Sequence, residues 1–412
     1  MGKGAAIAEK LRLDNWHTFA NTYVIFTWWS KLSNKLEKAP HKSRVALFTL
    51  VALLGIAGRL WAQTKPSNFD FNVWLTASQS LLDGNNPYAL AQFNYGPTWL
   101  GIITGIQSVS GDTQQFRLLI EVFLIAIDLG IAYVLIRKHY SLAGIVFFLS
   151  PIGIAISGQH QQIDNLAILT ALIAVIIAAR SNSDRLVGSD FVAALLIGLS
   201  LSIKHVFLLL PVWLLMRPNP IAKRLAYFGI PYLIFGLSLV IPFLSAPETV
   251  TRTMVQYGGA NNSPVLHFLL PDQLMTWIIS VDGTKIFFAV ALIFSGYLFR
   301  KVRLFEFTLI YTITAVVFSW SIVNQYLAVP IAAVAIWMNI GFLIWLILSS
   351  IYLWGDATTI NFPILNSIQP NTLLELDVVA KDLFPYILVG WLIIVASRNK
   401  LPKQRGSPVS LD

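Results

Sequence analysis

One acid and one lysine–histidine pair occupy turns between strongly apolar segments. Asp70 follows the first such segment of the chain, and Lys204 and His205 separate two later ones. A carboxylate can take the proton of a hydroxyl nucleophile, and cations stabilise a phosphate group as it leaves. These residue types predict transfer of a sugar from a polyprenyl phosphate. Asp70 would be the general base, and Lys204 and His205 would bind the donor phosphate.

Further polar and aromatic side chains fall in similar turns. The stretch 68–99 is polar and rich in turn and aromatic residues, and the turn 158–165 reads GQHQQIDN. A site between membrane helices would draw on such groups. The acids are too scattered to form a metal-binding cluster, so we expect no metal and no cofactor. We predict substrate-binding roles for Trp74, Tyr88, Tyr95, Gln159, His160, Gln161, Asp164, Asn324 and Gln325.

These residues also have structural interpretations. Asp70 can cap or end a helix, and Lys204 can anchor a helix end among lipid headgroups. The aromatic residues of 68–99 can form a belt at a membrane interface. Glu121 and Asp128 fall inside an apolar segment, where ionisable side chains are costly and often functional. Arg117 precedes Glu121 by four residues, so an ion pair within one helix is the alternative there.

The composition is that of a polytopic membrane protein. The 412 residues are 56% hydrophobic and 12% charged, with a mean hydropathy of +0.67. A soluble domain carries roughly 25% charged residues. The net charge of +9 is better explained by cytoplasmic loops than by nucleic-acid binding. There is no cysteine, so disulfides and cysteine metal sites are excluded.

About twelve apolar segments are candidate membrane spans, and several are shorter than the roughly 20 residues that a helix needs to cross a bilayer. Most of the 29 Lys and Arg residues fall in turns that this topology places inside, so both termini are predicted to be cytoplasmic. Arg59, near the outer end of the first span, is predicted to snorkel. The segments are 45–61, 116–136, 142–157, 163–179, 191–203, 206–216, 225–244, 286–299, 305–320, 326–338, 340–354 and 384–396.

This topology divides the chain into three parts. Residues 1–44 form a basic cytoplasmic segment, residues 45–397 the membrane-embedded domain, and residues 398–412 a basic cytoplasmic tail. The first loop of the domain, 62–114, is external and includes a short interfacial or re-entrant helix at 97–109. An interfacial helix is also predicted near the N-terminus. Its aromatic residues recur at steps of three or four: Trp16, Phe19, Tyr23, Phe26 and Trp29.

The first-loop motifs resemble those of the GT-C glycosyltransferases, which are polytopic enzymes that use dolichyl- or polyprenyl-phosphate sugars. Asp70 is followed by NPY at 86–88 and NYGPTW at 94–99. This order is similar to the acidic first loop and the YPP-type segment of the family. Gly96 stands where a proline is usual. The closest likeness is to the glucosyltransferases of asparagine-linked glycan assembly and to related prokaryotic mannosyltransferases.

Three later motifs follow in the order that this family has. SGQHQQIDNLAIL at 157–169 resembles its glutamine-rich turn and the helix after it, and GLSLSIKHVFLLLPVWLL at 198–215 resembles its external lysine turn. FSWSIVNQYLAVP at 318–330 looks like its late turn. That turn carries a His-Glu pair in the eukaryotic glucosyltransferases, and here the pair is Asn324-Gln325. The likeness covers roughly residues 45–335.

The resemblance implies an all-α, GT-C-like membrane enzyme. It implies inverting transfer of a hexose, mannose or glucose, from a polyprenyl-phosphate donor to a lipid-linked or glycan acceptor. Asp70 would act as base on the external or lumenal face, and the donor phosphate would bind near Lys204. Membrane lipids are expected partners and nucleic acid is not. The short connecting loops favour a prokaryotic plasma membrane over the endoplasmic reticulum.

Two other classes of protein remain open on the sequence. A transporter or flippase for a lipid-linked or small polar substrate would also have about twelve spans, but such proteins usually carry polar or broken spans near the membrane midplane. A non-catalytic membrane scaffold would explain the spans and leave the ordered external motifs unexplained.

Overall fold

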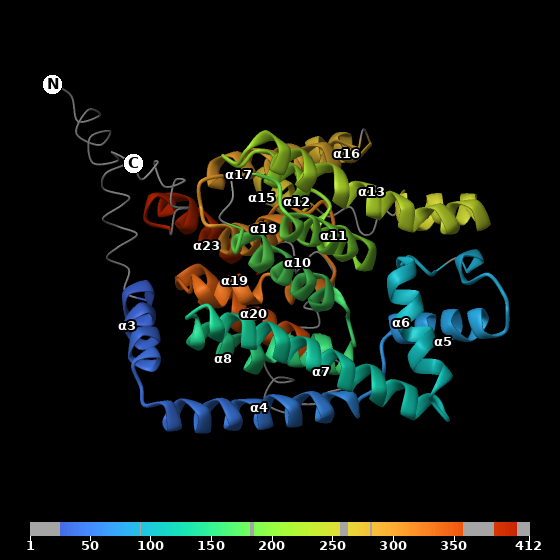
Figure 1. Ribbon diagram of the computed structural model, residues 1–412, viewed down its shortest axis with the longest axis horizontal. Helices are drawn as coiled ribbons and strands as arrows, with labels where there is room; N and C mark the ends of the chain where they lie inside the picture. Colours follow the sequence, from blue (N-terminus) through green and yellow to red (C-terminus); the bar gives the residue numbers. More distant parts are fainter. Residues whose placement is uncertain are drawn as a thin grey trace.

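The computed structural model describes residues 25–90, 92–181, 185–255, 263–280, 282–356 and 383–401. Within these ranges the chain is helical and contains no β-strand (Figure 1). Several predicted features lie outside the described residues. They are most of the N-terminal segment before residue 25, the greater part of the loop after residue 356, and the basic tail beyond residue 401.

The long helices α4 (His41–Gln63), α7 (Thr113–Arg137) and α13 (Ile221–Ser245) frame the molecule. α4 runs along one edge, beneath α7 and α8 (Ser141–Leu149) (Figure 1). α10 (Asp164–Ala179) packs between α7 and α11 (Gly188–Ile203), and α11 packs against α13. The remaining longer helices are α17 (Gly283–Phe299), α18 (Leu304–Val317), α20 (Ile340–Asp356) and α23 (Phe384–Ala396).

Short helical pieces connect these elements. Proline, which lacks an amide donor, is in the first turn of several of them, as in α9, α14 and α15. The pieces are α9 (Pro151–Gly153), η2 (Ile154–Gln159), η3 (His205–Phe207), α12 (Leu210–Leu215), α14 (Pro247–Val250), η4 (Thr251–Val255), α15 (Pro264–Leu269), α16 (Asp272–Ser280), η5 (Asn324–Leu327), α19 (Ile331–Ile336) and η7 (Arg398–Lys400).

The apolar helices indicate a membrane-embedded protein. Among the described residues, α4, α7 and α13 are long and apolar enough to cross a bilayer. Up to six spans result if each of three bent helix pairs counts as one, and five further apolar helices are 10–17 residues long. Each of the twelve segments predicted as spans is helical, in whole or in pieces. Twelve separate crossings stay a prediction, because several of these helices are too short to span alone.

The predicted first loop is a folded helical unit. α5 (Phe69–Leu82), η1 (Pro87–Ala89) and α6 (Pro97–Ser108) lie together at one end of the molecule (Figure 1). The sequence predicts the helix at α6, whereas α5 falls in a stretch that it describes only as turn-rich. The aromatic set forms the core of the unit: Trp74 packs edge-to-face on Tyr95 and on Trp99, with ring centroids 5.4 and 5.0 Å apart.

The predicted inside and outside turns gather at opposite ends of the bundle. At the basic end, Ser141 N donates to Glu37 Oε1 (2.9 Å) and Arg217 Nη1 donates to the Val302 carbonyl (2.7 Å). At the other end, here called the Asp70 end, the Asn86 side chain donates to the carbonyl of Ser245 (3.0 Å). The alternation of twelve spans stays a prediction.

Candidate functional site

Asp70 lies in the first turn of α5. Asn68 is the capping residue of this helix, because its side chain accepts a hydrogen bond from Phe71 N (3.1 Å). Asp70 is therefore free for another role, and the helix N-terminus favours its negative charge. Its Oδ2 accepts a hydrogen bond from Gln162 Nε2 (2.6 Å), its carboxylate also has a hydrogen bond with Tyr95, and the side chain is half-buried.

Lys204 lies at the end of α11, where the chain bends by 119° into the segment from His205 to Leu215. The predicted lysine turn is this bend. Lys204 is buried, and its Nζ lies 3.9 Å from Asp164 Oδ2, which is too far for a direct hydrogen bond. The same Nζ lies 4.7 Å from the centroid of the Tyr95 ring. The ammonium group is thus held between an aromatic face and a carboxylate that it does not closely bind.

A close backbone approach brings Tyr95 to Lys204. A Cβ atom at Gly96 would lie 2.0 Å from the carbonyl oxygen of Ser202, so only glycine fits there. The hydroxyls of Thr98 and Ser202 are also 2.8 Å apart. These contacts join the start of α6 to the end of α11. They give a physical reason for glycine where a proline is usual in the family that the sequence resembles.

Tyr95 is positioned as a proton donor. Burial raises the pKa of Tyr95 well above its ordinary value, and the nearby carboxylates of Asp70 and Asp164 raise it further. The phenol therefore stays protonated at neutral pH. It can donate a hydrogen bond to a carboxylate and cannot itself serve as a base.

Five residues from four segments converge to form what we call the Asp70–Lys204 site. α5 provides one carboxylate, the loop before α6 provides the phenol, the turn before α10 and the first residue of α10 provide an amide and a second carboxylate, and the end of α11 provides the ammonium group. The members are Asp70, Tyr95, Gln162, Asp164 and Lys204.

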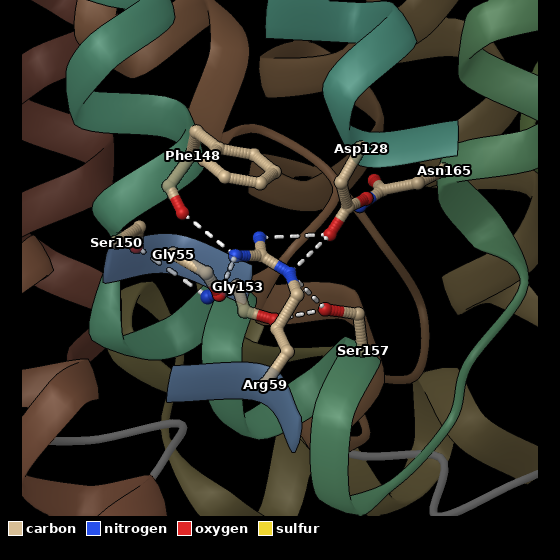
Figure 2. Close-up of polar contacts among 8 residues, drawn as sticks. All are labelled: Gly55, Arg59, Asp128, Phe148, Ser150, Gly153, Ser157 and Asn165. Atoms are coloured by element: carbon tan, nitrogen blue, oxygen red, sulfur yellow. Dashed lines mark hydrogen bonds and ion pairs between the residues drawn. The ribbon is translucent and has the colours of Figure 1, made fainter. Parts of the chain in front are cut away.

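The turn that contributes two of these residues is anchored by a buried arginine (Figure 2). Arg59 of α4 is fully buried, and its guanidinium pairs with Asp128 of α7 at 2.8 Å. Its Nε also donates to Ser157 Oγ (2.9 Å), and Asn165 Nδ2 donates to the other oxygen of Asp128 (2.6 Å). The Nη1 atom of Arg59 donates to the carbonyl of Phe148 (2.8 Å). The Arg59–Asp128 pair therefore holds both ends of the segment 157–165.

The expectation that Arg59 snorkels to the interface is wrong. A snorkelling side chain keeps its charge in water, whereas this guanidinium has no exposed surface and finds carbonyl, hydroxyl and carboxylate acceptors inside the bundle. The Arg117–Glu121 ion pair, the alternative interpretation of Glu121, is not among the ion pairs of the described residues. Arg117 Nη2 instead donates to the carbonyl of Lys65 (2.6 Å).

The segment 157–165 has an unusual backbone that fits its position. It starts in η2, a π-helical turn of the kind that recurs at functional sites. A Cβ at Gly158 would lie 2.8 Å from the carbonyl oxygen of Arg59, so this turn packs directly on α4. Gln161 has φ of 57°, which is uncommon for a residue other than glycine. Its side chain donates to the carbonyl of Arg117 (3.0 Å) and holds the reversal of the chain.

Four other residues predicted to bind substrate are Trp74, Tyr88, Gln159 and His160. Trp74 and Tyr88 are buried in the aromatic core behind Tyr95, so direct contact of these two rings with a substrate stays a prediction. Gln159 is buried at the end of η2, and His160 follows it, half-buried.

The late turn contains the short helix η5 (Asn324–Leu327), whose Tyr326 lines a pocket together with His205, the neighbour of Lys204 in the chain. Asn324 Oδ1 accepts a hydrogen bond from Tyr352 of α20 (2.9 Å), and Gln325 belongs to the same short helix η5. His205, next to Lys204, lines an apolar pocket with aromatic walls. Its other lining residues include Tyr311, Trp320 and Tyr326. The residue that follows Lys204 in the chain therefore lines an apolar pocket.

The sequence did not single out Gln162 or the Arg59–Asp128 pair as parts of the site. Asp128 falls inside one apolar segment and Arg59 inside another, and two opposite charges in such segments signal a buried pair. Gln162 has no such signal, since it is one of four polar residues in a row. Within the described ranges, no three His, Asp or Glu side chains are grouped to hold a metal ion.

Comparison with protein-family models, with curated proteins and with solved structures finds no match to this chain.

Proposed function

We propose that this protein is a membrane glycosyltransferase that transfers a hexose from a polyprenyl-phosphate donor to a hydroxyl acceptor. One observation carries the proposal: Asp70 and Lys204, 134 positions apart in the sequence, converge with Tyr95 and Asp164 on one site at the Asp70 end. A carboxylate can accept the proton of the acceptor hydroxyl, and a loosely paired ammonium group can stabilise the leaving phosphate.

The reaction assigns one task to each group. The acceptor oxygen attacks the anomeric carbon of the sugar from the side opposite the phosphate, and its proton passes to the carboxylate of Asp70. The bond between the anomeric carbon and the phosphate oxygen breaks, and the bonding electrons leave with the lipid phosphate. Attack from the opposite side inverts the configuration at the anomeric carbon. Gln162 orients the Asp70 carboxylate by its hydrogen bond to Oδ2.

Lys204 fits the developing negative charge of the leaving phosphate. Its ammonium group lies beyond hydrogen-bond distance of Asp164, so a phosphate oxygen can become its closest anionic partner. The apolar pocket at His205 lies beside this position and suits the lipid chain of the donor. Tyr95 stays protonated and can donate to a carboxylate as the charge in the site changes.

The proposed setting is an integral membrane protein with about twelve crossings and both termini in the cytoplasm. The separation of the two ends of the bundle supports this arrangement. The acceptor would be a glycan or glycolipid at the external face, and the membrane a prokaryotic plasma membrane. Labelling of single-cysteine variants with a membrane-impermeant reagent tests the sidedness, because the chain has no cysteine of its own. Labelling at residue 83 and not at residue 42 of intact cells is expected.

Sugar transfer by purified protein tests the activity. Radiolabelled polyprenyl-phosphate mannose or glucose would be supplied with a membrane lipid extract as acceptor, with and without EDTA. Wild-type protein should transfer label from one donor, and Asp70→Asn should reduce the rate by about 10²–10⁴-fold, the usual contribution of a general base. Donor binding should persist in the variant, because Asn keeps the shape of the side chain.

Asp83→Asn is the matched control, since Asp83 is an exposed carboxylate at the C-terminal end of the same helix, α5. It should transfer sugar at the wild-type rate. Equal transfer by wild type and Asp70→Asn would remove Asp70 from the role of base. Absence of transfer from both donors, together with uptake of a solute by protein in liposomes, would contradict the enzyme assignment.

A further inference from the structure

α3 (Ile25–Glu37) lies at the basic end of the bundle, beside the N-terminal end of α4 (Figure 1). It is docked there by specific contacts. Trp29 Nε1 donates to the carbonyl of Ala335 (2.9 Å), and Ser141 N donates to Glu37 Oε1 (2.9 Å). The helix is therefore a fixed part of the fold, with one side on the protein and the other side free.

The free side of α3 carries one aromatic residue and three lysines. Trp28, Lys31, Lys35 and Lys38 are exposed, and at 100° per residue they fall within an arc of about 80°. Trp28 alone has 58% of its surface exposed. Lys31, Lys35 and Lys38 also line one shallow depression at the turn between α3 and α4. We call these four residues the α3 stripe.

The acid of this helix is kept away from the stripe. Glu37 lies on the opposite side of α3, where it pairs with Arg44 at 3.6 Å in addition to the bond from Ser141. The positive charge of the lysines is therefore not neutralised within α3. Lys42 is exposed one turn further along and adds to the same field.

The stripe lies at the level where the apolar surface of α4 begins. Exposed apolar side chains of α4 start at Val45, seven residues after Lys38, and continue to Leu50 and Leu54. In a bilayer these side chains contact lipid tails, so the turn before them is at the depth of the headgroups. Tryptophan and lysine are the residue types that favour this depth.

We infer that the α3 stripe binds the phosphate headgroups of anionic phospholipids. The lysines provide three ammonium groups for phosphate oxygens, and Trp28 inserts its ring among the upper acyl chains. Each lysine near an anionic surface contributes about a fivefold gain in affinity, so the set gives roughly 100-fold. This inference depends on the membrane setting alone and is independent of the proposed sugar transfer.

Binding of a fluorescent short-chain phosphatidylglycerol tests the inference. The full-length protein in a neutral detergent at about 0.15 M salt would be compared with the triple variant Lys31→Gln, Lys35→Gln, Lys38→Gln. Wild type should bind phosphatidylglycerol and not phosphatidylcholine at the same concentration, and the triple variant should bind roughly 100-fold more weakly. The triple substitution by arginine should restore binding, because it restores the charge.

A matched triple variant removes three positive charges elsewhere on the described surface: Lys65→Gln, Arg252→Gln and Lys285→Gln. It should bind phosphatidylglycerol as wild type does. The inference is overturned if this control loses as much affinity as the α3 triple variant. Equal binding of the two lipids by wild type also overturns it. Because Lys31, Lys35 and Lys38 are exposed, the α3 triple variant should unfold at the wild-type temperature.

Discussion

The Arg59–Asp128 and Lys204–Asp164 pairs are both buried, but their geometries differ. Arg59 lies 2.8 Å from its carboxylate and also donates to a serine hydroxyl and to two backbone carbonyls. Lys204 lies 3.9 Å from its carboxylate, and its other described contact is the face of Tyr95. The first pair is closed, since it is surrounded by hydrogen-bonding protein groups, whereas the second is open in that it leaves the ammonium group without a carboxylate at hydrogen-bond distance.

The difference separates a structural pair from a candidate functional one. A buried charge is costly unless hydrogen bonds replace its water, and the arginine has such bonds. The lysine lacks a close partner of its own, which a fold selected for stability alone would not favour. A bound phosphate would supply that partner. The two pairs also act on one segment, since Arg59 anchors 157–165 and Lys204 faces Asp164 within it.

The largest effect is expected from breaking the closed pair. Arg59→Met leaves Asp128 buried without its cation and should destabilise the protein by about 3–5 kcal/mol. The measurement is reversible unfolding in mixed detergent micelles. Arg44→Met serves as control, because Arg44 belongs to the same helix and forms a more exposed pair with Glu37 at 3.6 Å. It should cost no more than about 1 kcal/mol. Similar losses in both variants would contradict a structural role specific to Arg59.

The next largest effect should separate two lysines by activity. Lys204→Met should lower sugar transfer by about 10²–10³-fold, as expected when one stabilising group for a developing anion is removed. Its stability should also fall, by about 3 kcal/mol, because Asp164 then stays buried without its cation. Lys223 is also buried, but it lies 3.1 Å from Asp190 and donates to Ser181, as Arg59 binds its own partners.

Lys223→Met is therefore the matched comparison. It should lose about 3 kcal/mol of stability and keep the wild-type transfer rate per folded molecule. Rates and unfolding midpoints measured on the same preparations give both numbers. Loss of transfer in Lys223→Met, or full transfer in Lys204→Met, would remove the distinction between a closed and an open pair.

The smallest effect should come from replacing the closed pair as a unit. Arg59→Met with Asp128→Leu removes both charges and fills similar volume, and such replacements are often neutral or stabilising. We expect the free energy of unfolding of the double variant to be within about 1 kcal/mol of the wild-type value. This is far closer to wild type than the value expected for Arg59→Met alone. Sugar transfer reports whether segment 157–165 keeps its place without these anchors. A double variant as unstable as the single one would show that the hydrogen bonds, and not the unpaired charge, dominate the cost.

Local patterns in the sequence were enough for the helical class and for much of the site. Apolar runs and composition predicted helices, and every predicted segment is helical because hydropathy and helix formation are local properties. The turns that carry Asp70, Asp164 and Lys204 were identified by their polar residues among apolar segments. Their assignment to one side of the membrane followed from counting spans, and the described residues do lie together.

Tertiary structure decided how those residues meet. α5 was described only as turn-rich, because its helix depends on packing of Trp74 and Phe71 in the aromatic core and less on its own pattern. The role of Arg59 depends on Asp128, 69 positions away, and no local rule links the two. The need for glycine at position 96 appears only when the backbone of Ser202 is in place. Composition and spacing are properties of the linear sequence. Close approach, burial and ion-pair geometry arise only between segments that folding brings together.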